Sequence, residues 1–202
     1  CAEMIGCRID TIPISPAVVA FDDMLSGSFA DRDVDITEEN IQSRIRGVTL
    51  MALSNKFGHM LLTTGNKSEM SVGYATIYGD MAGGYNPIKD AYKMTVFAIS
   101  EWRNAHKPRI GLGRDGPVIP ENIITKPPSA ELRPDQKDSD SLPDYPVLDK
   151  MLHALVEEEC SVDEVVAQGF DRDTVVRIER LLYLAEYKRR QAPPGVKLGA
   201  RN

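Results

Sequence analysis

Apolar residues recur at helical spacing in the first quarter of the chain. The recurring positions, at intervals of four, three and four, are Ile41, Ile45, Val48 and Ala52. This is the period of one face of an α-helix. Thr37 carries the hydroxyl of an N-cap, two glutamates follow it, and Gly58 suits a helix end. The pattern predicts a long amphipathic helix between residues 37 and 58.

Two other segments have the pattern of strands. Residues 7–15 alternate apolar and polar side chains, and residues 59–64 form a short apolar run that leads into Gly65 and a helix-competent stretch. Strands separated by helices predict an α/β sheet with helices on both faces. Ligands of such sheets bind beyond the carboxyl ends of the strands, which is where Thr64 would lie.

The rest of the chain is predicted to be helical around one long loop. We expect a helix at residues 93–104 and a loop over residues 106–144, which are rich in Pro, Gly and Asp. Ser161 and Glu164 have the spacing of a capping box, and a second amphipathic helix follows Gly169. There is no internal repeat, and the chain length suits one globular unit.

Composition excludes several classes of function. The net charge of -6 gives no electrostatic indication of nucleic-acid binding, although a local basic patch is compatible with it. Three cysteines, Cys1, Cys7 and Cys160, and three scattered histidines lack the spacing of a zinc site and indicate a reduced, cytoplasmic compartment. No apolar run approaches the length of a membrane span, and no export signal is recognisable at the first residues.

The segment 63–85 has the chemistry of a site for phosphate and a hard cation. It combines hydroxyl groups, carboxylates and glycines, in particular at Thr63, Thr64, Ser68, Glu69, Asp80 and Gly65. Magnesium prefers oxygen ligands, and glycine permits close approach of the backbone to a ligand. The residues alone are somewhat more typical of a glycine-rich turn with solvated carboxylates, and both interpretations remain open at this point.

Four segments in order resemble the glutamine-dependent NAD synthetases. They are ENIQSRIRG (39–47), TTGNKSEMSVGYATIYGDMAGGY (63–85), KPPSAELRPDQKDSDSLPDY (126–145) and EYKRRQAPPGVK (186–197). The resemblance extends from residue 7 to 197. It implies a Rossmann-like three-layer α/β sandwich of the N-type ATP pyrophosphatases, partial here, with a helical C-terminal part at residues 146–191. It also implies NAD biosynthesis: ATP adenylates deamido-NAD, and ammonia converts the adenylate to NAD, releasing AMP and pyrophosphate.

The resemblance assigns roles residue by residue. ATP would contact Thr64, Lys93 and Ser129. Deamido-NAD would contact Asn40, Arg44, Glu69 and Lys188. Mg²⁺ would bind at Glu69, with Asp80 as a weaker candidate. For Arg44 a surface ion pair and for Asp80 a surface turn are the alternatives.

Residues 126–145 resemble a mobile active-site loop that closes over the adenylate, with plain disorder as the alternative. The family's SGGxDS pyrophosphate loop and its amino-terminal glutaminase domain, the source of ammonia, have no counterpart here. We therefore expect residues 1–202 to be a synthetase domain incomplete at both ends, and inactive alone. By resemblance, the intact enzyme would be a ligase and a homodimer or larger oligomer.

Three other functions remain to be weighed. Residues 161–182 have the pattern of a helix-turn-helix, although the acidic residues of its second helix would repel DNA. A GMP synthetase or a tRNA-thiolating enzyme would share the adenylation step but use another acceptor. A scaffold role would use the long helix at residues 41–52 as a dimer interface, in addition to catalysis.

Overall fold

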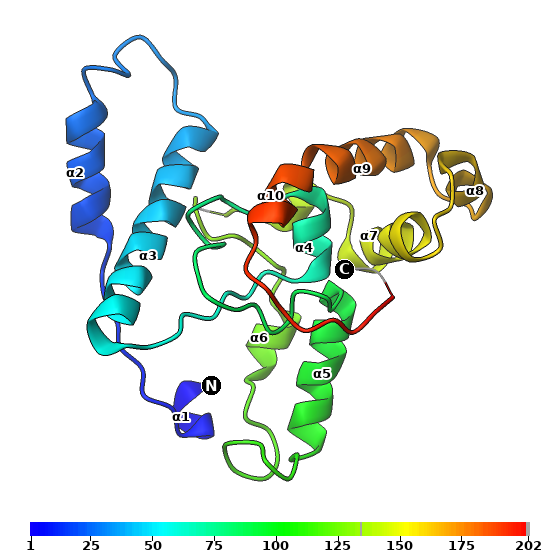
Figure 1. Ribbon diagram of the computed structural model, residues 1–202, viewed down its shortest axis with the longest axis horizontal. Coiled ribbons are helices and arrows are strands. Elements are labelled where there is room, and N and C mark those ends of the chain that lie inside the picture. The colour runs from blue at the N-terminus through cyan, green and yellow to red at the C-terminus, as the bar shows by residue number, and fades with distance from the viewer. Residues whose placement is uncertain (134, 201–202) are drawn as a thin grey trace.

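The computed structural model describes residues 1–133 and 135–200, and helices dominate it (Figure 1). The α-helices are α1 (Ala2–Ile5), α2 (Ser15–Leu25), α3 (Ile36–Phe57), α4 (Lys67–Val72), α5 (Lys93–Ala105), α6 (Glu121–Thr125), α7 (Tyr145–Leu152), α8 (Val162–Ala167), α9 (Arg172–Leu184) and α10 (Glu186–Gln191). A 3₁₀ turn, η1 (Asp138–Asp140), precedes α7, and a π-helical turn, η2 (His153–Glu157), follows it.

The long helix α3 is confirmed, but its N-cap differs from the predicted one. Asp35 caps it: its carboxylate accepts the N–H of Thr37 at 2.7 Å, and the Glu38 carboxylate accepts the N–H of Asp35 at 2.9 Å. This reciprocal capping box satisfies two backbone donors, which the Thr37 hydroxyl does not do. Gly58 ends the helix in the left-handed conformation, with φ 66°.

The predicted strand at residues 7–15 is wrong. Residues 7–14 have no regular secondary structure, and Ile9 is 74% exposed, so it lies against no sheet face. An alternating pattern gives a strand only where a neighbouring strand completes its hydrogen bonds. Ser15 instead begins α2, which the alternation concealed, and Pro16 lies in its first turn, where a missing N–H costs nothing.

The predicted sheet is reduced to two isolated parallel bridges in the described part of the chain. Leu62 pairs with Tyr85, and Asn86 pairs with Gly195. The N–H of Asn86 donates to the carbonyl of Pro194 at 2.8 Å. Pro194 itself has no N–H, so the ladder cannot continue through it. The described residues therefore show three parallel segments side by side, without the expected three-layer Rossmann sandwich.

The hydrophobic core lies between α4 and the C-terminal helices. Its most buried members are Leu148, Met151, Leu152, Val165, Val175 and Ile178, all fully enclosed. The helix pair α8 and α9, which resembles a helix-turn-helix in sequence, contributes three of these side chains and so has its apolar faces turned inward. The predicted helices at residues 93–104, after Ser161 and after Gly169 are all present.

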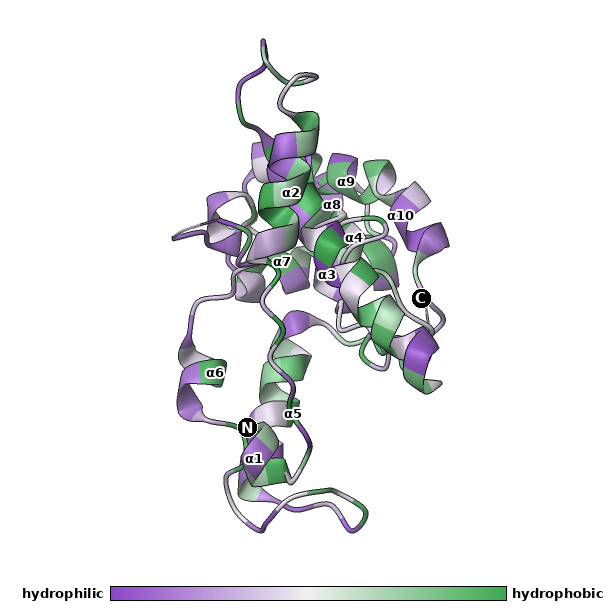
Figure 2. Cartoon of the chain, turned by 90° about the vertical axis from the view of Figure 1, so that its left-hand side faces the viewer, coloured by the Kyte–Doolittle hydropathy of each residue, from purple (hydrophilic) through white to green (hydrophobic). Residues whose placement is uncertain are grey.

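Helices α2 and α3 pack against each other at the edge opposite α7, α8 and α9 (Figure 1). Figure 2 shows apolar bands along α2, and Val19, Phe21 and Met24 are exposed there. No helix of the described residues combines the length and the apolar character that a bilayer crossing requires.

Candidate functional site

A cavity of about 550 Å³ lies between α3, the segment after it, α4 and the loop that contains Ser129. Seven of the eight predicted site residues line it: Asn40, Thr64, Glu69, Asp80, Lys93, Ser129 and Lys188. These residues come from segments up to 148 positions apart (Asn40 to Lys188). The fold therefore gathers side chains that local sequence pattern could not place together.

One face of α3 forms a wall of this cavity. The lining residues follow helical spacing: Ile36, Glu39, Asn40, Ser43, Gly47 and Leu50. Arg44 is not among the described residues that line the cavity. Its Nε donates to the carbonyl oxygen of Ile77 at 3.2 Å on an exposed surface. The structure therefore does not bring Arg44 and Asn40 together at one ligand site.

A tight turn at residues 76–80 supports Asn40 from behind. The Thr76 hydroxyl donates to the Asn40 side-chain oxygen at 2.9 Å, and the Thr76 N–H donates to the Asp80 carboxylate at 2.7 Å. The Ser43 hydroxyl also donates to Asp80, at 3.4 Å. Burial raises the pKa of the Asp80 carboxyl above its ordinary value, against the lowering effect of these bonds. Asp80 thus has a defined structural role in the turn.

Two glycines permit this turn to approach α3 so closely. A Cβ at Gly79 would lie 2.2 Å from the Ser43 Oγ, and a Cβ at Gly47 would lie 2.8 Å from the carbonyl oxygens of Tyr78 and Gly79. Tyr78 between them has φ 64°. The glycines of residues 63–85 were predicted to permit approach to a ligand; Gly79, opposite Gly47 of α3, instead permits approach of the backbone to a helix.

Lys188 reaches the cavity from α10. Its Nζ donates to the carbonyl oxygens of Gly73 at 2.7 Å and Ala75 at 2.6 Å. Burial lowers the pKa of Lys188, and the charge of Asp80 raises it to a smaller extent. An ammonium has three donors, so the two carbonyls hold the Lys188 head in place and leave a third donor for a ligand.

Glu69 and Lys93 form an ion pair at the cavity. Asn66 caps α4, and the Glu69 carboxylate completes the capping box with one oxygen while the other accepts from Lys93 Nζ at 2.8 Å. Both side chains are 18% exposed. Thr64 lies just before this cap. The adjacent Thr63 hydroxyl is buried, with no hydrogen-bond partner among the described residues.

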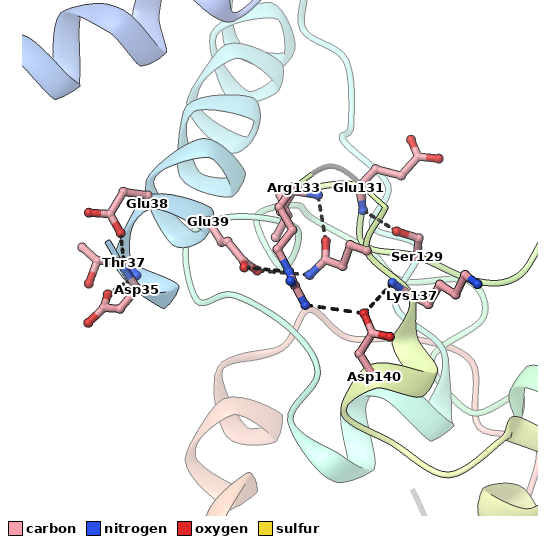
Figure 3. A network of polar contacts seen from close by, with 11 residues as sticks. Asp35, Thr37, Glu38, Glu39, Ser129, Glu131, Arg133, Lys137 and Asp140 are labelled. Carbon is pink, nitrogen blue, oxygen red and sulfur yellow. Dashed lines mark hydrogen bonds and ion pairs between the residues drawn. The ribbon is translucent and has the colours of Figure 1, made fainter. Parts of the chain in front are cut away.

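The loop that carries Ser129 is bound to α3 across the cavity (Figure 3). Glu39 accepts from Gln136 Nε2 at 3.1 Å and pairs with Arg133 Nε at 3.4 Å. From the same helix, Arg46 donates to the carbonyl oxygen of Glu131 at 3.0 Å. The Ser129 hydroxyl accepts the N–H of Glu131 at 3.1 Å. Pro134, in the middle of this loop, lies outside the described residues.

Sequence reasoning missed three charged residues of the cavity wall: Glu39, Arg46 and Arg133. Glu39 and Arg46 share a face of α3 with Asn40, so helical spacing could have identified both. No local signal in the sequence could identify Arg133, because its loop lies at the cavity through contacts with α3, nearly a hundred residues earlier in the chain.

The carboxylates of the site do not form a ready-made metal cage. Among residues 1–133 and 135–200, no three side chains of the His, Cys, Asp or Glu type are grouped so that they could hold a metal ion. Glu69 offers a carboxylate beside Lys93, a predicted ATP contact, and Glu39, Asp80 and Asp138 also line the cavity. This donor set fits a cation that arrives with its own phosphate and water ligands.

A comparison with protein-family models finds a match to the model described as NAD synthase over residues 1–192. The chain belongs to the NAD synthase family. The resemblance noted in the sequence is therefore confirmed, and family membership argues against the GMP synthetase, tRNA-thiolating and helix-turn-helix alternatives.

Individual relatives agree with this assignment to the NAD synthase family. A glutamine-dependent NAD(+) synthetase of Rhodobacter capsulatus is 59% identical over 201 residues, which cover 99% of this chain and 36% of the relative. The chain thus spans about a third of the length of the curated relatives it matches. The solved structure of a glutamine-dependent NAD+ synthetase of Acinetobacter baumannii, in complex with ADP, is 41% identical and has a TM-score of 0.58, covering 100% of this chain and 34% of that one.

A third comparison bears on the fold. The crystal structure of a glutamine-dependent NAD(+) synthetase of Cytophaga hutchinsonii has a TM-score of 0.77 at 24% identity, covering 100% of this chain and 33% of that one. At this identity the likeness shows only that the chain has an NAD-synthase-type fold. The helix-rich arrangement described above is therefore the form that this fold takes over these residues.

Proposed function

We propose that this chain provides the cavity in which an NAD synthetase uses ATP to amidate deamido-NAD. The observation that carries the proposal is the convergence of seven predicted ligand-contacting side chains on one cavity. Family membership supports the choice of reaction, and the ADP complex of the A. baumannii relative supports the use of an adenine nucleotide. By this proposal the protein is a C–N bond-forming ligase of NAD biosynthesis.

The reaction has two steps. In the first, an oxygen of the nicotinate carboxylate of deamido-NAD attacks the α-phosphorus of ATP, and the bond to pyrophosphate breaks. In the second, ammonia attacks the carbonyl carbon of the acyl adenylate, AMP leaves with the bridging oxygen, and nitrogen loses a proton to give the amide. We propose that glutamine, through a separate glutaminase domain, supplies the ammonia. The cavity must hold two anionic substrates together and exclude water from the adenylate.

The cations of the cavity suit this task. Lys93 would stabilise the negative charge of the ATP phosphates, with the Thr64 and Ser129 hydroxyls as further contacts. Lys188 and Asn40 would contact deamido-NAD on the side of α10 and α3. Both groups are already fixed by protein hydrogen bonds, Lys188 by two carbonyls and Asn40 by Thr76. This preorganisation lowers the entropic cost of binding. Arg44 would contact deamido-NAD through the guanidinium N–H groups that remain beside its Nε bond to Ile77.

Magnesium would enter as the ATP complex. When bound, it neutralises charge on the departing pyrophosphate. Glu69 would supply a carboxylate oxygen, and phosphate oxygens and water would supply the remaining ligands. Asp80 remains a weaker metal candidate, because burial raises the pKa of its carboxyl and so disfavours the charged form that binds a cation.

Two further parts of the proposal concern motion and fold. We propose that residues 126–145 form a lid, held by the contacts of Arg133 and Gln136 with Glu39, that opens for substrate entry. We also propose that the two parallel bridges mark the position of a Rossmann-like parallel sheet. Thr64 follows one of these bridges, where such sheets bind ligands. Oligomerisation through the helix at residues 41–52 stays a prediction.

Turnover tests the proposal in a chimera of the R. capsulatus relative, in which residues 1–202 of this chain replace the matching segment. We expect NAD formation from deamido-NAD, MgATP and an ammonia source. Lys93→Met in the chimera should lower kcat/KM about 100-fold, the scale for loss of one electrostatic contact to a transition state. Asn55→Ala, on an exposed part of α3, is the matched control. A folded chimera without NAD formation would contradict the proposal.

A further inference from the structure

Helices α4, α5 and α7 meet at a buried polar junction behind the cavity. The Asp149 carboxylate, from α7, accepts the Ser68 hydroxyl at 2.5 Å with one oxygen and the N–H of Met94 at 2.8 Å with the other. The Ser68 Oγ in turn accepts the N–H of Lys93 at 2.8 Å. Ser68 is fully buried and Asp149 is 8% exposed. Asp149 therefore links one residue of α4 to the first turn of α5.

This junction lies directly behind the ion pair of the cavity. Ser68 precedes Glu69 on α4, and the Lys93 N–H that donates to Ser68 belongs to the same residue whose Nζ pairs with Glu69. Asp149 is not among the described residues that line the cavity. Its influence on a ligand would consequently pass through Ser68, Lys93 and Glu69.

A buried carboxylate is costly unless hydrogen bonds offset its desolvation. Burial raises the pKa of the Asp149 carboxyl, while the bonds from Ser68 and Met94 and the charge of Lys93 lower it. A neutral or apolar side chain would fill this position without that cost. The Asp149 carboxylate has two acceptor oxygens. One accepts from Ser68 of α4 and the other from Met94 of α5, and an amide with a single oxygen cannot accept from both.

We infer that Asp149 is a positioning residue for the ATP site, which fixes Lys93 relative to Glu69 by joining the first turn of α5 to Ser68. The inference rests on the proposed function, because it assigns Asp149 a role in the nucleotide binding that Lys93 carries. Asp149 touches no substrate. It fixes the position of the Lys93 ammonium to which MgATP binds.

A double-mutant cycle separates this role from simple support of the fold. Calorimetry on the full chain would measure the Kd for MgATP with wild type, Asp149→Asn, Lys93→Met and the double variant. We expect Asp149→Asn to weaken binding about tenfold, the scale for a lost charge-assisted hydrogen bond. In the Lys93→Met background the same change should have no further effect, because the group it positions is absent. Asp163→Asn, an exposed acid of α8, is the control.

Two outcomes of the double-mutant cycle would contradict the inference. Unchanged MgATP affinity in a folded Asp149→Asn variant contradicts it, and so does a tenfold loss that persists beside Lys93→Met. Should Asp149→Asn not give a cooperative thermal transition, Ser68→Ala takes its place. It cuts the link to the Lys93 N–H and leaves the Met94 bond intact. It should weaken MgATP binding by about fivefold, on the scale of one neutral hydrogen bond, and unchanged affinity would contradict the inference.

A second readout needs no ligand and so distinguishes the two proposals. Hydrogen exchange of the Lys93 and Met94 amides should be at least about tenfold faster in Asp149→Asn than in wild type. Asparagine has only one acceptor oxygen, so it cannot accept from both the Met94 N–H and Ser68, whose Oγ is the acceptor of the Lys93 N–H. If wild type binds no MgATP, the proposed function fails, and exchange still decides whether Asp149 holds the start of α5. Equal exchange rates would overturn the positioning role.

Discussion

The carboxylate of Glu69 and the ammonium of Lys93 lie 2.8 Å apart at the edge of the cavity, each with 18% of its side chain exposed. Lys93 also lies over the ring of Tyr145, 5.1 Å from its centroid. Both side chains line the cavity, so a ligand bound there can reach the charge of either partner. A magnesium nucleotide complements both partners: the cation faces Glu69 and the phosphates face Lys93.

Glu69→Gln should therefore weaken MgATP binding more than binding of ATP without metal. Glutamine keeps the capping geometry of α4 but removes the charge that attracts Mg²⁺. We expect a loss of about tenfold in the presence of Mg²⁺ and little change in EDTA, measured by calorimetry. Asp80→Asn is the comparison variant. If Asp80→Asn weakened ATP binding only in the presence of Mg²⁺, the metal would be assigned to Asp80. Equal losses for Glu69→Gln with and without Mg²⁺ would contradict this account.

Deprotonation of Lys188 should weaken the binding of deamido-NAD at alkaline pH. A lysine carries charge below its pKa, and burial has lowered that of Lys188 from its ordinary value of 10.5. Affinity for deamido-NAD should thus fall as pH rises through the lowered pKa, before an exposed lysine would titrate. In Lys188→Arg the fall should move to higher pH, because arginine stays charged. Lys56→Arg, away from the cavity, should leave the profile unchanged; an identical profile for Lys188→Arg would exclude Lys188 as its cause.

Loss of Glu39 should release the loop at residues 126–145. Glu39 receives both Arg133 and Gln136, so Glu39→Ala removes two contacts at once. We expect faster hydrogen exchange across this loop and weaker MgATP binding by about threefold to tenfold, with the global unfolding transition retained. Glu179→Ala on α9 serves as the control. Unchanged exchange in the loop would show that other contacts hold it.

Gly79→Ala should destabilise the fold by about 1–3 kcal/mol, the usual cost of overpacking a closely packed contact. The added methyl would lie 2.2 Å from the Ser43 Oγ and 3.0 Å from its Cβ, so the turn at residues 76–80 would move away from α3. Gly27→Ala is a matched control, because no atom lies within 4 Å of its added Cβ. Urea unfolding of both variants would measure the difference, and equal midpoints would refute the close contact.

Local patterns in the sequence predicted the helices well. The spacing of Ile41, Ile45 and Val48 predicted α3, and the spacing of Ser161 and Glu164 predicted the start of α8. Both signals depend on residues within one or two turns of each other. The strand at residues 7–15 was predicted by the same kind of local signal and was wrong, because a strand depends on a neighbour that local pattern does not report.

Prediction of the site from sequence was also limited to residues that the family resemblance or local spacing could identify. Resemblance identified Thr64, Lys93 and Lys188, and the structure places all three at one cavity, although their roles stay proposals. Arg44 was expected to contact deamido-NAD together with Asn40, but it is not among the described residues that line the cavity, and it bonds to Ile77. The pair of Glu39 and Gln136 is 97 residues apart in sequence, and only tertiary structure shows it.

Binding of deamido-NAD to the ATP-loaded chain tests the central claim most directly. Calorimetry would titrate deamido-NAD, and separately xanthosine monophosphate, into the chain saturated with Mg²⁺ and a non-hydrolysable ATP analogue. We predict saturable one-to-one binding of deamido-NAD, at least about tenfold tighter than the monophosphate, and weakened by Lys188→Met. Absence of deamido-NAD binding by the folded, nucleotide-loaded chain, or equal affinity for the two ligands, would contradict the claim that this cavity holds ATP and deamido-NAD together.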